Sequence, residues 1–302
     1  MGQPARIALA SCDPYPLVAD DEEPLRIALR QRGYAVVDPA WDADFDWSSC
    51  AAVLIRCTWD YQTRCDEFLA WCERVSAVTL LLHGPRIVRW NVDKRYLAQL
   101  EQRGVPIADT TWLAGHDADL EARLTTAVRS WERGFLKPVV GANASDTLRF
   151  VCGAGGVASA IAHVRSHAGA FMLQPYLKAV ESQGELSIIV IDGEPSHAIR
   201  KVPAAGDYRV QEDWGARDEP WQADAAALAL ARKALAAANA ILGERLLYGR
   251  VDLLTSDAGY VLNELELVEP ALFFRHSTET AERLAAALVA RIRDARVLTT
   301  SS

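Results

Sequence analysis

Three glutamates stand inside an otherwise apolar stretch near the end of the chain. Glu264, Glu266 and Glu269 alternate with leucine and valine between Asn263 and Pro270. Successive side chains of a strand point to opposite faces, so Glu264 and Glu266 share a face, on the order of 7 Å apart. Partly desolvated like charges repel at that distance, and a divalent cation with oxygen ligands, such as Mg²⁺, relieves the repulsion. We interpret this stretch as a candidate metal-binding strand.

A third carboxylate precedes these glutamates in a second apolar run. Asp252 lies between Val251 and Leu253, and a turn near residues 255–259 connects this run to the glutamates. A hairpin with that turn would place Asp252 beside Glu264 or Glu266. The alternative is that all of these acids lie on the wet face of a half-exposed antiparallel sheet.

Two lysines stand in distinctive settings. Lys137 lies in an apolar β pattern directly before Pro138, and Lys94 lies near the start of a helix. Either lysine alone could be a surface residue whose stem is buried. Together with the acids, they complete the set that phosphoryl transfer requires, namely cations for phosphates and carboxylates for a metal. The combination favours the metal interpretation of the acidic strands.

A run of small residues and an interrupted strand could complete a nucleotide site. Residues 141–145 are small, so their backbone N–H groups could approach phosphate oxygens. The run lacks the Walker pattern, and a plain β-turn explains it equally well. The strand before Pro175 could offer its edge to a planar base, with Leu173, Tyr176 or Leu177 covering the faces. The alternative there is an ordinary core strand end.

The N-terminal third offers a candidate substrate site. Arg56 and Asp60 follow an apolar strand, and ligands of open α/β sheets lie beyond the carboxyl ends of strands. Arg56 could grip a carboxylate in a bidentate fork, and Asp60 could bind an amino group. Such a pair would suit an amino-acid-like substrate. A purely structural Arg–Asp pair is the alternative.

Composition limits the classes of function. The 302 residues carry a net charge of −8, which argues against a nucleic-acid partner. No apolar run reads as long enough to cross a bilayer, and the first residues do not resemble a signal peptide. The six cysteines show no C-x-x-C spacing, so we expect reduced thiols in a cytoplasmic protein. A Rossmann-type oxidoreductase is disfavoured because no glycine motif follows the first strand.

The order of the elements predicts three parts. A strand at 6–12, a helix at 23–33 and a strand at 51–61 form a parallel α/β unit, whereas hairpins dominate after residue 135. We place an N-terminal substrate-side domain at 1–88. A subdomain with the lysines and the small-residue loop follows at 89–175. A subdomain with the acidic strands occupies 176–302.

This order of features resembles the ATP-grasp superfamily, and within it the glutathione-synthetase-like ligases. The match consists of a helical lysine, a strand lysine before proline, a small-residue loop, the "LQPYL" strand, the basic "IRKVPAAGDYR" segment and an acidic hairpin. The fold that the resemblance implies is α/β and α+β, with a parallel N-terminal domain before two subdomains that clasp ATP. Glu266 stands where such ligases often have asparagine.

The resemblance also implies roles for individual residues. The cofactors would be ATP and two Mg²⁺ ions, and the partner a small amino-acid-like substrate. Lysines would hold the phosphates, a strand would bind adenine, and basic side chains would steady the transferred phosphoryl group and the substrate carboxylate. By role, these are Lys94, Lys137 and Ser145 for phosphate; Gln174, Pro175, Tyr176 and Leu177 for adenine; Glu181 for ribose; Asp252, Glu264 and Glu266 for metal; Lys201 and Arg209, with Arg200 as the alternative to Lys201, for transfer and substrate.

The implied reaction joins a carboxylate to a nitrogen through an acylphosphate. The "RCTWDY" and "RWNVDKRYL" stretches further resemble a small ATP-grasp group that includes the cycloserine-forming cyclo-ligase, which acts on O-ureido-D-serine. Under that resemblance one molecule provides both the carboxylate and the nucleophile. The alternatives are a two-substrate ligase of the glutathione or dipeptide kind and a non-catalytic nucleotide-binding module. Relatives also suggest a homodimer.

Overall fold

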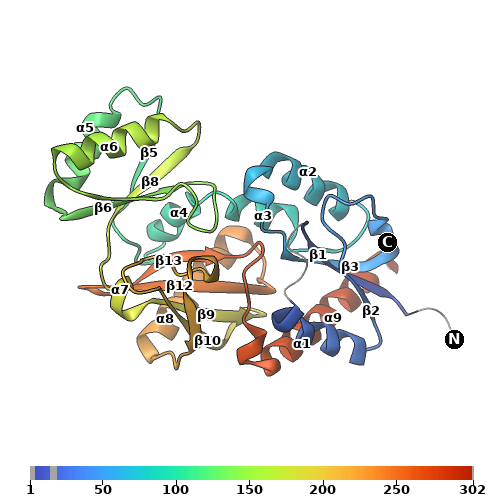
Figure 1. Cartoon of the computed structure of the whole chain (residues 1–302). Coiled ribbons are helices and arrows are strands. Elements are labelled where there is room, and N and C mark those ends of the chain that lie inside the picture. The colour runs from blue at the N-terminus through green and yellow to red at the C-terminus, as the bar shows by residue number, and fades with distance from the viewer. Residues whose placement is uncertain (1–3, 14–18, 301–302) are drawn as a thin grey trace.

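The computed structural model describes residues 4–13 and 19–300. The described residues form three sheets, which follow one another along the chain (Figure 1). The sequence predicts a Pro-rich loop after the first strand, and residues 14–18 of it lie outside the described residues.

The N-terminal unit is a parallel sheet in the order β2-β1-β3-β4. This confirms the predicted parallel α/β unit. Helix α1 ends before Gly33, whose φ of 85° suits a residue without a Cβ. The elements are β1 (Arg6–Ser11), α1 (Ala19–Gln31), β2 (Ala35–Val37), η1 (Trp47–Ser49), β3 (Cys50–Cys57), η2 (Tyr61–Thr63), α2 (Cys65–Ser76) and β4 (Leu81–Leu82). Two short helices, α3 (Pro85–Asn91) and α4 (Tyr96–Gln102), lead to the next sheet.

The second sheet is small and antiparallel, in the order β5-β8-β6-β7. It has a hydrophobic core of its own, which includes Leu113, Leu136 and Leu173. In Figure 1 it stands apart from the other two sheets, at the upper left. The elements are β5 (Thr111–Ala114), α5 (Leu120–Ala127), η3 (Val128–Ser130), β6 (Arg133–Pro138), β7 (Leu148–Val151), α6 (Ala154–Arg165) and β8 (Ala170–Pro175).

The third sheet is the central one and is antiparallel, in the order β11-β10-β9-β12-β13. The predicted hairpin at 255–259 connects two neighbouring strands of this sheet, and a second hairpin at 192–194 connects two others. The elements are α7 (Val180–Gln183), β9 (Glu185–Ile191), β10 (Glu194–Val202), η4 (Glu212–Trp214), β11 (Arg217–Pro220), α8 (Ala225–Leu242), β12 (Tyr248–Ser256) and β13 (Gly259–Glu266).

Helix α8 differs from the expectation that no apolar run could cross a bilayer. Its 18 residues, Ala225–Leu242, are long and apolar enough to do so by length and composition alone. In the structure, however, Leu230, Ala234 and Leu235 are buried in the core that α8 shares with the central sheet. Its apolar composition therefore has a sufficient explanation as the core helix of a packed domain.

The chain closes on the N-terminal unit. Helix α9 (Thr278–Thr300) follows η5 (Phe274–His276) and packs beside α1, as Figure 1 shows. One buried cluster contains Leu9 of β1, Tyr248 of β12 and Leu284 of α9. The N-terminal sheet and the central sheet therefore share a continuous core, whereas the second sheet joins the central core through Met172 of β8.

Candidate active site

A cavity of about 510 Å³ lies where the three sheets meet. Its lining combines residues from the N-terminal unit, the small sheet and the central sheet. Lys94, Lys137 and the 141–145 loop line one part, the acidic strands another, and Trp59 and Tyr61 a third. Pockets of this size between domains commonly hold small ligands. The cavity therefore brings most of the predicted site residues together.

The acidic hairpin forms as predicted. Strands β12 and β13 are antiparallel, and Asp252 is the register partner of Glu264. The register shifts directly afterwards, because Leu253 pairs with Leu262 and leaves Asn263 as an extra residue. Glu264 and Glu266 both line the cavity, which places these acids on the side of the ligand and not on an outer wet face.

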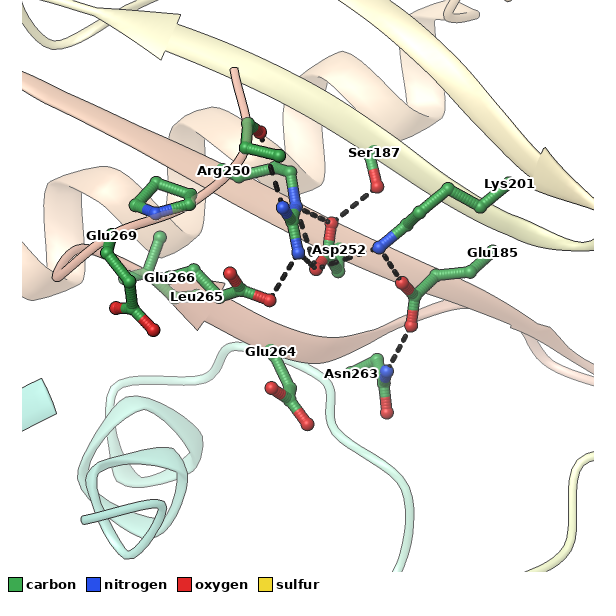
Figure 2. A network of polar contacts seen from close by, with 12 residues as sticks. Glu185, Ser187, Lys201, Arg250, Asp252, Asn263, Glu264, Leu265, Glu266 and Glu269 are labelled. Atoms are coloured by element: carbon green, nitrogen blue, oxygen red, sulfur yellow. Dashed lines mark hydrogen bonds and ion pairs between the residues drawn. The ribbon is translucent and has the colours of Figure 1, made fainter. Parts of the chain in front are cut away.

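Arg250, which the sequence reasoning did not single out, lies at the centre of this hairpin. Its Nε donates to both oxygens of Asp252, at 2.9 and 3.1 Å, and its Nη2 donates to Asp252 and to Glu266 (Figure 2). Burial opposes the charge on Asp252, but Arg250 and Lys201 outweigh it and hold the pKa of Asp252 well below its usual range. The signal for Arg250 was its i, i+2 spacing to Asp252, which puts both on one face of a strand.

A chain of contacts joins the other charged groups. Lys201 pairs with Glu185 and lies 3.4 Å from an oxygen of Asp252. Asn263 donates to Glu185 and accepts from Lys137 Nζ, at 2.6 Å. Lys137 thus reaches from the small sheet to the central sheet, in agreement with the predicted convergence of lysine and acids.

The predicted metal ligands differ in their availability. Glu264 and Glu266 offer carboxylate oxygens to the cavity, and burial raises the pKa of Glu266 to about 7 although Arg250 lowers it. An arriving cation would relieve that crowding of acids, so this pair fits Mg²⁺. Asp252 fits less well than predicted, because Ser187 (2.5 Å), Arg250 and Lys201 occupy its oxygens. Within the described residues, no three acidic, histidine or cysteine side chains form a ready metal cluster.

The phosphate side consists of the lysines and the small-residue loop. Lys94 Nζ donates to the carbonyl of Gly141 at 2.5 Å, and Ser145 lines the cavity. Asn143 and Ala144 have φ values of 55° and 54°, so the backbone makes an unusually tight turn here. A left-handed turn of this kind can aim successive N–H groups at an anion.

The predicted adenine strand borders the cavity, but the predicted ribose residue does not. The end of β8 and the residues after it, Gln174–Leu177, all line the cavity. The side chain of Gln174 is held by Thr110, at 2.9 Å. Glu181 lies outside the lining and pairs with Arg149 and with the hydroxyl of Tyr176, at 2.9 and 2.6 Å. In the free protein the carboxylate of Glu181 serves this ion pair, and its ribose role stays a prediction.

The three basic candidates after β9 lie in different places. Lys201 points into the cavity, whereas its neighbour Arg200 pairs with Glu219 outside the lining. Alternation along β10 explains the difference, and the alternative assignment of Arg200 to the substrate was wrong. Arg209 lines the cavity, where its guanidinium pairs with Asp207 at 2.7 Å and lies 3.6 Å from the ring centre of Trp214.

Of the predicted substrate pair, Arg56 lines the cavity and Asp60 does not. Arg56 is 1% exposed and its fork already grips the buried Glu22, at 2.5–3.1 Å. Asp60 accepts from Trp41 Nε1 at 2.8 Å, outside the lining of the cavity. Each side chain thus has a structural partner distant in sequence, and the substrate roles of Arg56 and Asp60 stay predictions.

Comparisons with known proteins agree with this geometry. A family profile for the N-terminal domain of D-cycloserine synthetase DcsG matches residues 7–83, and one for the ATP-grasp domain of prokaryotic glutathione synthetase matches residues 116–252. Over 291 residues, the chain is 38% identical to the cycloserine biosynthesis protein DcsG of Streptomyces lavendulae, covering 90% of this chain and 94% of that protein.

Two solved structures show the same arrangement of sheets. The crystal structure of D-cycloserine synthetase DcsG matches with a TM-score of 0.86 and 34% identity, covering 95% of this chain and all of that one. The D-alanine–D-alanine ligase of Bacillus anthracis matches with a TM-score of 0.72 over 99% of this chain and 100% of that one. At 15% identity, this second likeness concerns the fold alone.

Proposed function

We propose a function from one premise: the chain belongs to the ATP-grasp ligase family that contains D-cycloserine synthetase. This membership confirms the predicted ATP-grasp fold and makes the protein an ATP-dependent carbon–nitrogen ligase. The finer proposal is that it activates the carboxylate of O-ureido-D-serine, or of a close analogue, and closes the ring of cycloserine. The 38% sequence identity to the Streptomyces protein, which extends over 94% of that protein, supports this choice.

The proposed reaction has two steps. A carboxylate oxygen of the substrate attacks the γ-phosphorus of ATP, the bond to the bridging oxygen breaks and ADP leaves. A nitrogen of the same substrate then attacks the acyl carbon. The new carbon–nitrogen bond forms as the carbon–oxygen bond to phosphate breaks, and the nitrogen gives up a proton. In O-ureido-D-serine this nitrogen also carries a carbamoyl group, so cycloserine requires in addition that water cleave this group to carbon dioxide and ammonia.

The observation that carries the proposal is the reach of Lys137 across the cavity to Asn263, with Glu264 at 3.6 Å. It places a cation for phosphate beside the acids that would hold Mg²⁺. Glu264 and Glu266 would hold this ion, which neutralises phosphate charge when it is bound. Lys94 and Lys137 would steady the phosphates, while Lys201 and Arg250 supply fixed positive charge held by Asp252. Preorganised charge of this kind lowers the barrier without a protein nucleophile.

A screen of ADP release tests the proposal. The protein is incubated with Mg·ATP and single D- or L-amino acids or O-substituted serines. We expect O-ureido-D-serine alone to stimulate ADP release, and removal of Mg²⁺ with EDTA to abolish it. A strict need for two compounds would favour the two-substrate ligase. Binding of ATP without ADP release for any compound would overturn the enzymatic proposal.

The remaining expectations concern the setting of the enzyme. A cytoplasmic location and a homodimer stay predictions, the first from the cysteine pattern and the second from relatives. Small-molecule partners agree with the net charge of −8, which does not favour nucleic acid.

A further inference from the structure

The carboxylates around the cavity are almost all matched to a donor. Nine of the ten that line it in the described part of the chain pair with a cation or accept from an amide. By carboxylate, the partners are Arg275 for Asp21, Glu212 and Asp218; Arg56 for Glu22; Lys201 for Glu185; Asn143 for Asp213; Arg250 for Asp252 and Glu266; and Lys137 for Glu264. The tenth is Glu269. Its side chain has neither a cationic partner nor a side-chain donor in the described residues, and Figure 2 shows it apart from the Arg250 contacts.

The backbone around Glu269 is held firmly. Trp59 Nε1 donates to the carbonyl of Glu269 at 3.3 Å, and Arg56 Nη2 donates to the carbonyl of Pro270 at 3.1 Å. Arg250 Nη1 donates to the carbonyl of Ala271 at 3.3 Å. Three consecutive carbonyls thus accept from three side chains, of which Arg56 lies in β3, Trp59 just after β3 and Arg250 in β12. Such fixed backbone preorganises the carboxylate for a ligand.

The negative charge of Glu269 is not balanced by a neighbouring positive group of the described residues when no ligand is bound. Burial and the charge of Glu266 raise the pKa of Glu269 to about 8, against its own backbone N–H, Arg250 and Lys94, which lower it. In the same cavity lining, Arg56 is 1% exposed, and its Nη1 has no acceptor among the described residues. Glu269 is half-buried at the cavity, and a half-buried carboxylate without a cationic partner is less favourable than a paired one. A cationic group of a ligand would remove part of that cost.

We propose that Glu269 recognises the ammonium group of the substrate and so makes the ligase select zwitterionic amino acids over simple carboxylic acids. This inference rests on the proposed function, because it places the substrate in this cavity. Glu269 follows Glu264 and Glu266 closely along the chain. In the proposed reaction, the substrate carboxylate meets phosphate beside Glu264 and Glu266. One substrate molecule would then present its carboxylate to the phosphate side and its ammonium group to Glu269. Glu269 takes the role that sequence reasoning had given to Asp60.

The test compares O-ureido-D-serine with its deamino analogue, 3-(ureidooxy)propanoate. The wild-type kcat/KM should favour the amino compound by about 100-fold or more, because a site built for a polar group discriminates strongly against its absence. Glu269→Gln should reduce that preference at least about 30-fold, mainly through a higher KM for the amino compound. Affinity for Mg·ATP, measured by calorimetry, should stay within about threefold, since no nucleotide role is assigned to Glu269.

Matched variants separate recognition from packing. Glu219→Gln removes a carboxylate outside the cavity and should leave the preference unchanged. Glu269→Asp retains the charge and should recover part of the preference, whereas Glu269→Ala should lose it as Glu269→Gln does. A purely structural role for Glu269 would not produce that ordering.

The outcomes are distinguishable. If the wild-type protein releases ADP but Glu269→Gln and Glu269→Ala keep the full preference, the assignment of Glu269 is overturned and the proposed function stands. If the wild-type protein releases ADP with no amino acid, the proposed function itself fails.

Discussion

Two neighbouring parts of the cavity lining treat negative charge in opposite ways. At the acidic hairpin, Asp252 and Glu266 are bound to Arg250, and Glu264 lies 3.6 Å from Lys137. Glu269, three residues further along the chain, has no cationic partner among the described residues. The hairpin acids sit within a closed network before any ligand arrives, whereas the charge of Glu269 is left for the ligand to complete.

This difference separates two tasks. Phosphate and Mg²⁺ are the same in every turnover of a ligase, so their site can be built from charges that already balance one another. The carbon substrate differs between ligases, and a single unmatched charge can decide which molecule is accepted. In that view the matched network supports rate, and Glu269 supports selectivity.

The largest effect should come from neutralising the hairpin. Glu264→Gln removes a carboxylate that we assign to Mg²⁺, and ADP formation should fall by about 10³-fold or more. The protein should remain folded by circular dichroism, and Glu101→Gln, an exposed change on α4, should leave ADP formation unaltered. Normal turnover by Glu264→Gln would remove the proposed contrast between the acidic hairpin and Glu269.

The next effect concerns stability. Arg250→Met leaves Asp252 and Glu266 without their guanidinium partner, and loss of one member of a buried ion pair typically costs about 3–5 kcal/mol. The midpoint of urea unfolding should fall accordingly. Arg200→Met, which removes an ion pair outside the cavity, should change the free energy of unfolding by less than about 1 kcal/mol. Equal losses for the two variants would contradict a special role for the network.

The smallest effect should be a pH-dependent change in stability caused by Glu269. The folded-state pKa of Glu269, about 8, lies above its ordinary value of 4.5, so the folded state binds the proton more tightly. Stability should therefore fall as pH rises from about 4.5 to about 8. Glu269→Gln has no carboxyl group at this position and does not show this loss of stability. Its free energy of unfolding, relative to that of the wild type, should therefore rise by about 1–3 kcal/mol from pH 5 to pH 9.

Urea unfolding at pH 5, 7 and 9 measures this gain. Glu219→Gln, which changes a paired carboxylate, serves as the control. If the free energies of unfolding of Glu269→Gln and wild type differ by the same amount at pH 5 and pH 9, the pKa of Glu269 is not raised in the free protein.

Sequence reasoning reached the parts of the site that local rules specify. Alternation along a strand placed Glu264 and Glu266 on one face, and the turn at 255–259 brought Asp252 opposite Glu264. The same rule separated Lys201 from Arg200. It could also have identified Arg250, two residues before Asp252.

Pairings between distant elements lay beyond those rules. Arg56 meets Glu22 of α1, and Asp60 meets Trp41, neither of which a local pattern indicates. It is harder still to predict from the sequence that Glu269 has no cationic partner among the described residues, because every neighbouring element has to be known first. Only the assembled structure shows which charges remain unmatched.

The distribution of the cores also has a mechanical consequence. Leu9, Tyr248 and Leu284 join the N-terminal and central sheets in one core, whereas the small sheet has its own. The small sheet joins the central core through Met172 of β8, with Trp112 of β5 packed against it. We therefore expect any widening of the cavity to occur at this junction, where fewer buried side chains would separate than between the other two sheets. Such a change would carry Lys137 and the 141–145 loop away from Glu269.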